Sequence, residues 1–125
     1  MRLLLDTHIF LWLASANPQL SPRSKQVIES AEKVFVSSAT IWEIAIKVRL
    51  GKLKADLDQL IREIEANRFE ELPVLARQAK LVAALPLHHG DPFDRLLIAQ
   101  AIAEPLHLLT VDPKLKEYSE LVIQV

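Results

Sequence analysis

Short apolar runs alternate along this chain with segments that have the residue spacing of helices. Residues 3–5, 34–36 and 106–111 are almost continuously apolar, which is typical of strands that are buried on both faces. Strands of this kind that alternate with helices form a parallel sheet with helices on both sides. The sequence therefore predicts an α/β fold, a three-layer sandwich around a short central parallel sheet.

Serine, threonine or aspartate marks the predicted helix starts, in places followed by proline, which suits the first helical position. The predicted helices span about residues 21–33, 41–50, 56–67, 75–85 and 91–103, with a short last helix from residue 112, and further strands span 69–72 and 121–125. No linker, repeat or low-complexity run interrupts this series. Residues 1–125 are therefore predicted to be a single domain.

The composition excludes several classes of protein. The chain has no cysteine, which excludes thiol catalysis, cysteine-ligated zinc and disulfides, and fits a reducing cytoplasm. Its net charge of −1 argues against a general cationic surface for nucleic acid, although a cluster of metal-binding carboxylates would itself subtract charge. The apolar N-terminal stretch resembles a signal peptide, but Asp6 and His8 interrupt it. We therefore expect a cytoplasmic protein with no membrane segment.

Acidic residues stand where the predicted elements should meet. Asp6 and Asp112 follow apolar strands, and Asp94 lies in the first turn of the helix that Asp91 begins. Each position has an ordinary explanation, because aspartate is a good helix cap and an acid in the first turn suits the helix dipole. However, the carboxyl ends of parallel strands meet at one edge of a sheet, which would bring these acids together.

Glu43 is unusual because it lies in the apolar stretch 41–46. Its ordinary explanation is an exposed ion pair with Lys47, one helical turn later. If Glu43 instead joins the three aspartates at the sheet edge, the four carboxylates would repel one another unless a cation neutralised them. Hard oxygen ligands of this kind suit Mg²⁺ or Mn²⁺.

Four segments carry these acids in a recognisable pattern. They are LLLDTH at residues 3–8, SATIWEIA at 38–45, HGDPFDRLLIAQA at 89–101 and LLTVD at 108–112. Together they resemble the PIN-domain family, and more narrowly its VapC-type ribonuclease toxins of bacterial toxin–antitoxin pairs. The resemblance covers nearly the whole chain, in the family's order and at its spacings, and the segment that ends in Asp94-Arg95 is the most specific.

The resemblance implies a PIN-like sandwich, Mg²⁺- or Mn²⁺-dependent endoribonuclease activity, a homodimer and a cognate antitoxin that blocks the site. The family's acidic quartet corresponds to Asp6, Glu43, Asp94 and Asp112, which we predict to be the catalytic and metal-binding residues. Asp6 and Asp94 would hold the principal ion, while Asp112 and Glu43 would orient water or hold a second ion. The expected reaction is hydrolysis of an RNA phosphodiester by metal-activated water, which leaves a 5′-phosphate.

Other residues of these motifs are candidates for supporting roles. Asp91 matches a position that is acidic in this subgroup, and Thr7 and Thr110 match hydroxyl positions that would orient carboxylates or water. Arg95 is expected to contact either RNA phosphate or a neighbouring acid.

Further residues have two readings each. His88 and His89 suggest zinc, but no other histidine lies at ligand spacing, so we prefer a loop pair before a helix cap. The basic stretch 47–54 either contacts RNA or is a solvated helix end. Trp42 is expected in the core or in a dimer contact rather than as a platform for RNA bases.

Two other functions are compatible with part of the pattern. A receiver-like phosphoacceptor domain has a similar length and acids at strand ends, but it would need paired acids after the first strand, where Asp6 stands alone. A non-catalytic interaction module with the PIN fold is argued against by the presence of all four acids.

Overall fold

The computed structural model describes residues 1–125, and its strands form one parallel sheet. The strands are β1 (Arg2–Leu5), β2 (Lys33–Ser37), β3 (Glu70–Leu72), β4 (His107–Thr110) and β5 (Val122–Gln124). Their order across the sheet is β3-β2-β1-β4-β5. This confirms the predicted α/β fold, and it differs from the order 2-1-3-4-5 that a receiver-like domain requires.

Helices connect the strands and differ from the predicted ones at several places, among them the helix directly after β1, which was not predicted. They are α1 (Thr7–Ala14), α2 (Pro22–Ser30), α3 (Ser38–Arg49), α4 (Leu57–Ala66), α5 (Ala76–Ala79) and α6 (Pro92–Ala103), with 3₁₀ helices η1 (Lys80–Ala84) and η2 (Pro113–Tyr118). α2 ends earlier than predicted because Ala31 is already extended toward β2. The single helix predicted over 75–85 is instead α5 followed by η1, and Leu85 is extended as a residue before proline should be. The last short helix is 3₁₀ rather than α.

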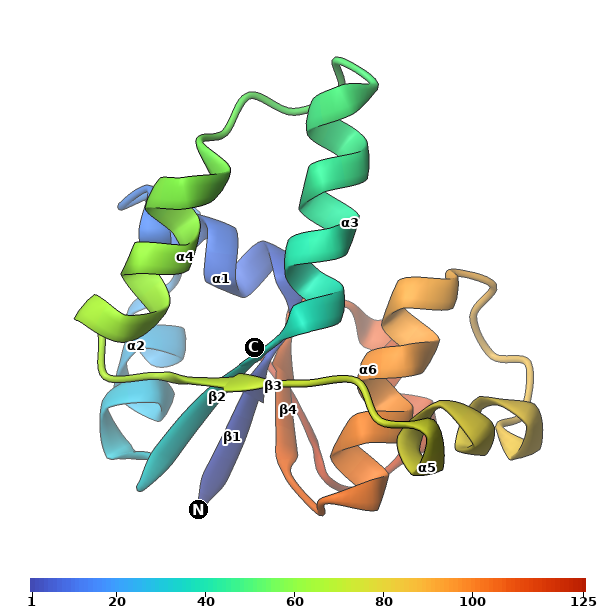
Figure 1. Ribbon diagram of the computed structural model, residues 1–125. Coiled ribbons are helices and arrows are strands. Elements are labelled where there is room, and N and C mark those ends of the chain that lie inside the picture. Colours follow the sequence, from blue (N-terminus) through green and yellow to red (C-terminus); the bar gives the residue numbers. More distant parts are fainter.

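The core lies in two layers, one on each face of the sheet. Within β1, Leu3 and Leu5 pack into one layer and Leu4 into the other, as the two-residue period of a strand requires. The first layer is closed by α1, α2, α3 and α4, and the second mainly by α6 and η2. Figure 1 shows α1, α2 and α4 gathered on one side of the strands and α5 and α6 on the other. No helix combines the length and apolar character needed to cross a membrane.

The strand order fixes where a site can form. β1 pairs with β2 on one side and with β4 on the other, and the chain reaches β4 only after a long excursion through β3 and α6. This is the topological switch point of the sheet, where ligands of parallel α/β proteins bind beyond the carboxyl ends of the strands. Leu5 and Leu109 are register partners. Asp6 and the segment that carries Asp112 therefore leave the sheet side by side.

Candidate active site

The carboxylate of Asp6 accepts hydrogen bonds from its neighbour Thr7 and from Thr110 of β4. Its carboxylate caps α1 by accepting the Thr7 amide at Oδ1 (2.6 Å), and it accepts the Thr110 hydroxyl of β4 at Oδ2 (2.6 Å). The residue is only 3% exposed. Burial raises the pKa of Asp6 above its usual range, and the Thr110 hydroxyl offsets part of this effect. The helix cap and the site position expected from the sequence are therefore both present at this residue.

Glu43 projects from α3 and is also buried. The Thr7 hydroxyl donates to Oε1 (2.8 Å), and the Lys47 ammonium donates to Oε2 (2.7 Å). The predicted ion pair with Lys47 is thus confirmed, but it is not the solvated pair expected, because Glu43 is 5% exposed. The hydrogen bond that Lys47 donates to Glu43 raises the pKa of Lys47. α3 begins at Ser38, after the cap residue Ser37, and so starts earlier than the helix predicted over 41–50.

Asp94 and Asp112 come from two different elements and meet at a histidine ring. Nε2 of His89 lies 3.0 Å from Oδ2 of Asp94 and 3.1 Å from Oδ2 of Asp112. The other oxygen of Asp112 caps η2 through the Lys114 amide (2.9 Å). Asp91 has a different task, since its Oδ1 accepts the amide of Asp94 (3.0 Å) at the start of α6.

The electrostatics show that the acids are close neighbours. The pKa of Asp94 is raised to about 8, first by burial and then by the negative charges of Asp6, Asp91, Glu43 and Asp112. Apart from the Lys47–Glu43 pair, the only cationic or titratable nitrogen paired with these acids is that of His89. Carboxylate oxygens this crowded are a suitable donor set for a divalent cation, and the group formed by His89, Asp94 and Asp112 has ligand atoms near enough to share one.

Arg95 does not form the ion pair with a neighbouring acid that the sequence suggested. Its guanidinium donates to the backbone carbonyls of Pro86 (2.9 Å) and Val82 (3.1 Å) and to the hydroxyl oxygen of Tyr118 (3.1 Å). Arg95 therefore secures the loop that precedes α6.

His89 is the residue that sequence reasoning missed. A zinc site would need a further histidine at ligand spacing. The groups that His89 contacts are instead two acids, one on α6 and one in the segment after β4. The signal available in the sequence was its place directly before the most specific motif.

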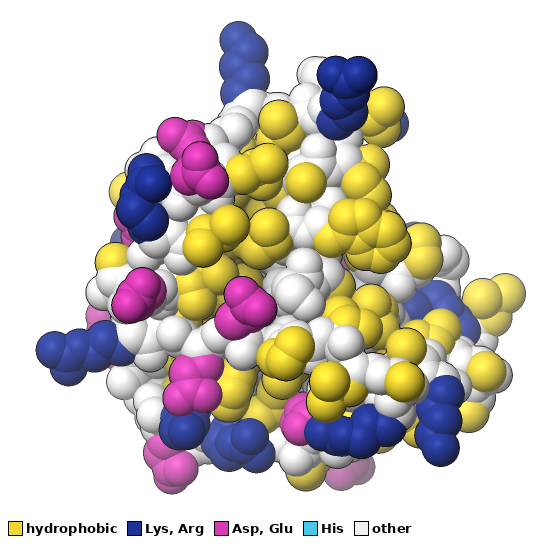
Figure 2. All heavy atoms as spheres, viewed as in Figure 1, with side chains coloured by type: hydrophobic (Ala, Val, Ile, Leu, Met, Phe, Trp, Pro, Cys, Tyr) yellow, Lys and Arg dark blue, Asp and Glu magenta, His cyan; other side chains and the backbone are white.

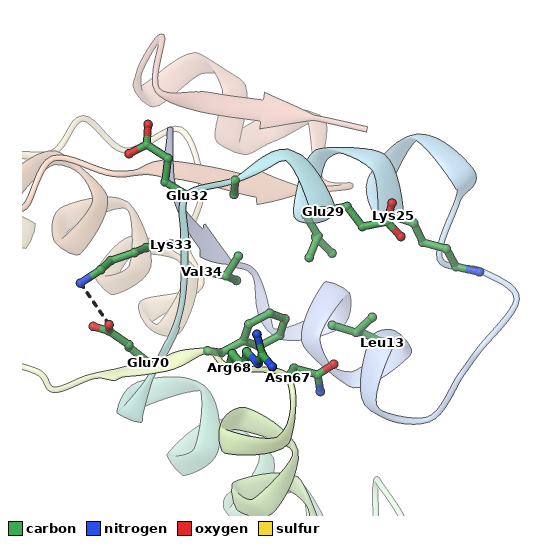
Figure 3. Close-up of a pocket in the computed structure, with 12 residues that line it drawn as sticks. Leu13, Lys25, Glu29, Glu32, Lys33, Val34, Asn67, Arg68 and Glu70 are labelled. Atoms are coloured by element: carbon green, nitrogen blue, oxygen red, sulfur yellow. Dashed lines mark ion pairs between the residues drawn. The ribbon is translucent and has the colours of Figure 1, made fainter.

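Two cavities lie outside the acid cluster. One, of about 600 Å³, opens at the amino ends of β2 and β3, where Lys33 and Glu70 form an ion pair of 3.1 Å (Figure 3). The other, of about 570 Å³, is lined by the loop after α3 and includes Lys47, Lys52 and Lys54. Only the second adjoins the acids, through the contact of Lys47 with Glu43.

Comparisons with known proteins agree with this geometry. Ribonuclease VapC22 of Mycobacterium tuberculosis is 28% identical to this chain over 118 residues, which cover 92% of this chain and 90% of that protein. The fold is similar to VapBC2 from Rickettsia felis bound to a promoter DNA fragment (TM-score 0.73, 21% identity, 100% of this chain and 98% of that chain). It is also similar to a toxin–antitoxin complex from Klebsiella pneumoniae (TM-score 0.68, 22% identity, 97% and 95%).

At these sequence identities, the similarity to the solved structures establishes the fold alone. The family is shown by the sequence itself, since the model of the PIN domain matches residues 3–121. That span includes all four acids of the predicted quartet. The chain belongs to the PIN-domain family and is related to its VapC ribonuclease toxins.

Proposed function

We propose that this chain is a VapC-type toxin, a divalent-metal-dependent endoribonuclease that hydrolyses RNA phosphodiester bonds. The observation that carries the proposal is the convergence of acids from four separate segments at the switch point of a PIN fold, where burial and then the charges of its neighbours raise the pKa of Asp94 to about 8. The relative from Mycobacterium tuberculosis, named as a ribonuclease, supports the same activity.

The four acids have distinct positions for this chemistry. Asp6, Asp94 and Asp112 would hold Mg²⁺ or Mn²⁺, with Glu43 as the fourth acid of the site. A bound divalent ion activates water and stabilises negative charge that develops on phosphate. The chain's own contribution is orientation, because Thr110 fixes the carboxylate of Asp6 and Thr7 fixes that of Glu43.

Thr7 links the two buried acids. Its amide donates to Asp6 and its hydroxyl to Glu43, so a single residue sets the distance between β1 and α3 at the site. Lys47 places its ammonium against the buried carboxylate of Glu43, and the hydrogen bond that it donates raises the pKa of the lysine. The lysines of the adjoining cavity, Lys52 and Lys54 with Lys47, would attract the phosphates of RNA.

We also propose a cognate antitoxin and a homodimer as partners, in the cytoplasm. The similar structure from Klebsiella pneumoniae is described as a toxin–antitoxin complex, which supports the antitoxin. Exposed apolar side chains support a second subunit. Trp42 is 59% and Leu50 is 61% exposed, so the expectation of a core position for Trp42 is wrong. Figure 2 shows hydrophobic side chains gathered over α3.

The function is tested by incubating the purified protein with total RNA in Mg²⁺, in Mn²⁺ or in EDTA and mapping the cut ends. Cleavage should require a metal and leave 5′-phosphates. Asp6→Asn and Asp94→Asn should each lower turnover by at least ~100-fold, because the loss of a metal ligand removes several kcal/mol of transition-state stabilisation. Glu65→Gln, which changes an exposed acid of α4, is the matched control. Full activity in EDTA would contradict the metal mechanism, and no cleavage with any metal would indicate the non-catalytic module.

A further inference from the structure

The ring of His89 lies between two acids that belong to different elements. Asp94 is on α6, and Asp112 follows β4 and begins η2. No hydrogen bond or ion pair joins these two carboxylates to each other, and the ring nitrogen Nε2 is within 3.1 Å of both. The histidine side chain is 18% exposed, so it is enclosed by the site rather than free in solvent.

The backbone of His89 is held in place by Tyr118. The tyrosine hydroxyl accepts the amides of His88 (3.1 Å) and His89 (2.8 Å) and donates to the His89 carbonyl (3.3 Å). The same hydroxyl oxygen accepts a hydrogen bond from Arg95, which also binds the carbonyls at the start of the loop. Tyr118 and Arg95 thus fix the short loop that carries His89.

The second ring nitrogen shows which way the imidazole is protonated. Nδ1 of His89 accepts the amide of Asp91 (3.4 Å), so Nδ1 carries no proton. The ring N–H is then on Nε2, the nitrogen that lies between Asp94 and Asp112. The ring therefore offers the two carboxylates a polar N–H.

We propose that His89 is a positioning residue of the nuclease site, which ties Asp94 to Asp112 and is itself placed by the Tyr118–Arg95 contact. This inference rests on the proposed function, because it assigns a task to two of the acids that would hold the metal. In this proposal Arg95 and Tyr118 touch neither metal nor substrate and act by holding the loop that carries His89.

The physical reason is that a metal ion needs both carboxylates ionised, and like charges on separate elements tend to move apart. Asp94 feels the negative charge of Asp112, and nothing in either backbone holds the two side chains together. Hydrogen-bonding partners that orient metal ligands commonly change metal affinity by about 10–100-fold when they are removed. We expect His89 to have an effect of this size.

The first test is Mn²⁺ binding measured by calorimetry for three variants. His89→Ala should weaken the affinity by about 10–100-fold, and His89→Gln, which keeps an N–H donor at similar reach, should recover most of the loss. Glu65→Gln, which changes an exposed acid of α4 away from the loop, is the control and should bind like wild type. Urea unfolding in EDTA establishes that each variant is folded.

Two results would overturn the positioning role. Affinity in His89→Ala that equals or exceeds that of wild type would mean that the ring competes with the cation for the carboxylates. A His89→Gln variant as weak as His89→Ala would mean that the imidazole nitrogen is itself a ligand.

The second test needs neither metal nor RNA, so its result is independent of the proposed nuclease activity. In EDTA, ¹⁵N chemical shifts of the ring should show the proton of His89 on Nε2. A proton on Nδ1 would refute the inference even in an active nuclease. Conversely, failure to bind Mn²⁺ would contradict the proposed function. The spectrum would still show which ring nitrogen of His89 carries the proton.

A third test concerns the tyrosine. Tyr118→Phe removes the hydroxyl but leaves the ring that packs edge-on against His88. It should weaken Mn²⁺ binding in the wild-type background and have no further effect in His89→Ala, since its influence passes through His89. Equal losses in both backgrounds would contradict this coupling.

Discussion

Neutralising Asp94 should make the metal-free protein more stable. The pKa of Asp94 is about 8 in the folded chain against 3.8 for an ordinary aspartate, so at pH 7 the unfolded chain loses a proton that the folded chain keeps. Each pKa unit corresponds to about 1.4 kcal/mol, which puts the resulting cost to the free energy of unfolding at roughly 4 kcal/mol. Asparagine is neutral in both states and avoids this cost.

The gain depends on pH in a defined direction. Because the folded pKa is raised, the cost is absent below about pH 4, where the carboxyl is protonated in both states. It grows as the pH rises from about 4 to 8 and is constant above that. Asp94→Asn should therefore match wild type at pH 4 and exceed it by on the order of 2–4 kcal/mol at pH 7, after allowance for altered contacts with His89.

The assay is urea unfolding of both proteins in EDTA at pH 4, 7 and 8.5, with Glu65→Gln as the control for loss of an exposed acid. Mn²⁺ should then stabilise wild type more than the mutant, since a ligand that binds the native state raises stability by mass action. A mutant that is less stable than wild type in EDTA at pH 7 would refute the reasoning. In that case Asp94 would be acting mainly as a first-turn acid of α6, which favours the helix dipole.

Three further predictions concern other parts of the molecule. Lys47→Met should leave Glu43 buried without its cation and lower the free energy of unfolding by about 1–2 kcal/mol, discounted for the partial exposure of Lys47, as measured in urea. Ser21→Ala should cost about 1 kcal/mol in the same measurement, because the serine side chain caps α2. Light scattering at tens of micromolar should give the mass of a dimer and Trp42→Glu should reduce it; a wild-type monomer would count against the homodimer.

The parallel sheet was predictable because its strands are buried on both faces. Runs such as residues 3–5 and 34–36 have almost no polar side chains, and only a doubly covered sheet accommodates them. The order of the strands was not predictable from local pattern, since the pairing of β1 with β4 joins residues about a hundred positions apart. The split of the predicted helix over 75–85 depends on local packing and on Pro86, and only its end carries a sequence signal.

The closeness of Asp6, Asp94 and Asp112 was predictable because strand ends and helix starts converge by topology, whereas Glu43 was suggested by its apolar surroundings and the family resemblance. Their neighbours were harder to assign. His89 has no distinguishing spacing, and its contacts exist only once α6 and the end of β4 are side by side. Arg95 was expected to contact a phosphate or an acid and instead donates to backbone carbonyls. A pattern of side chains along the sequence does not reveal contacts with the backbone. The exposure of Trp42 likewise depends on which face of α3 the sheet covers.

The hydrogen bond from Thr110 to Asp6 has a consequence for how the protein is made. It joins the first strand to the fourth, which lie next to each other in Figure 1. On the ribosome β1 emerges before β2, β3 and α6, and β4 and Asp112 emerge only after all of them. Contacts so distant in sequence form late and fold slowly. A nascent chain that has not yet exposed the segment after β4 therefore lacks the complete acid cluster, and any activity of this site begins only once Asp112 has left the exit tunnel.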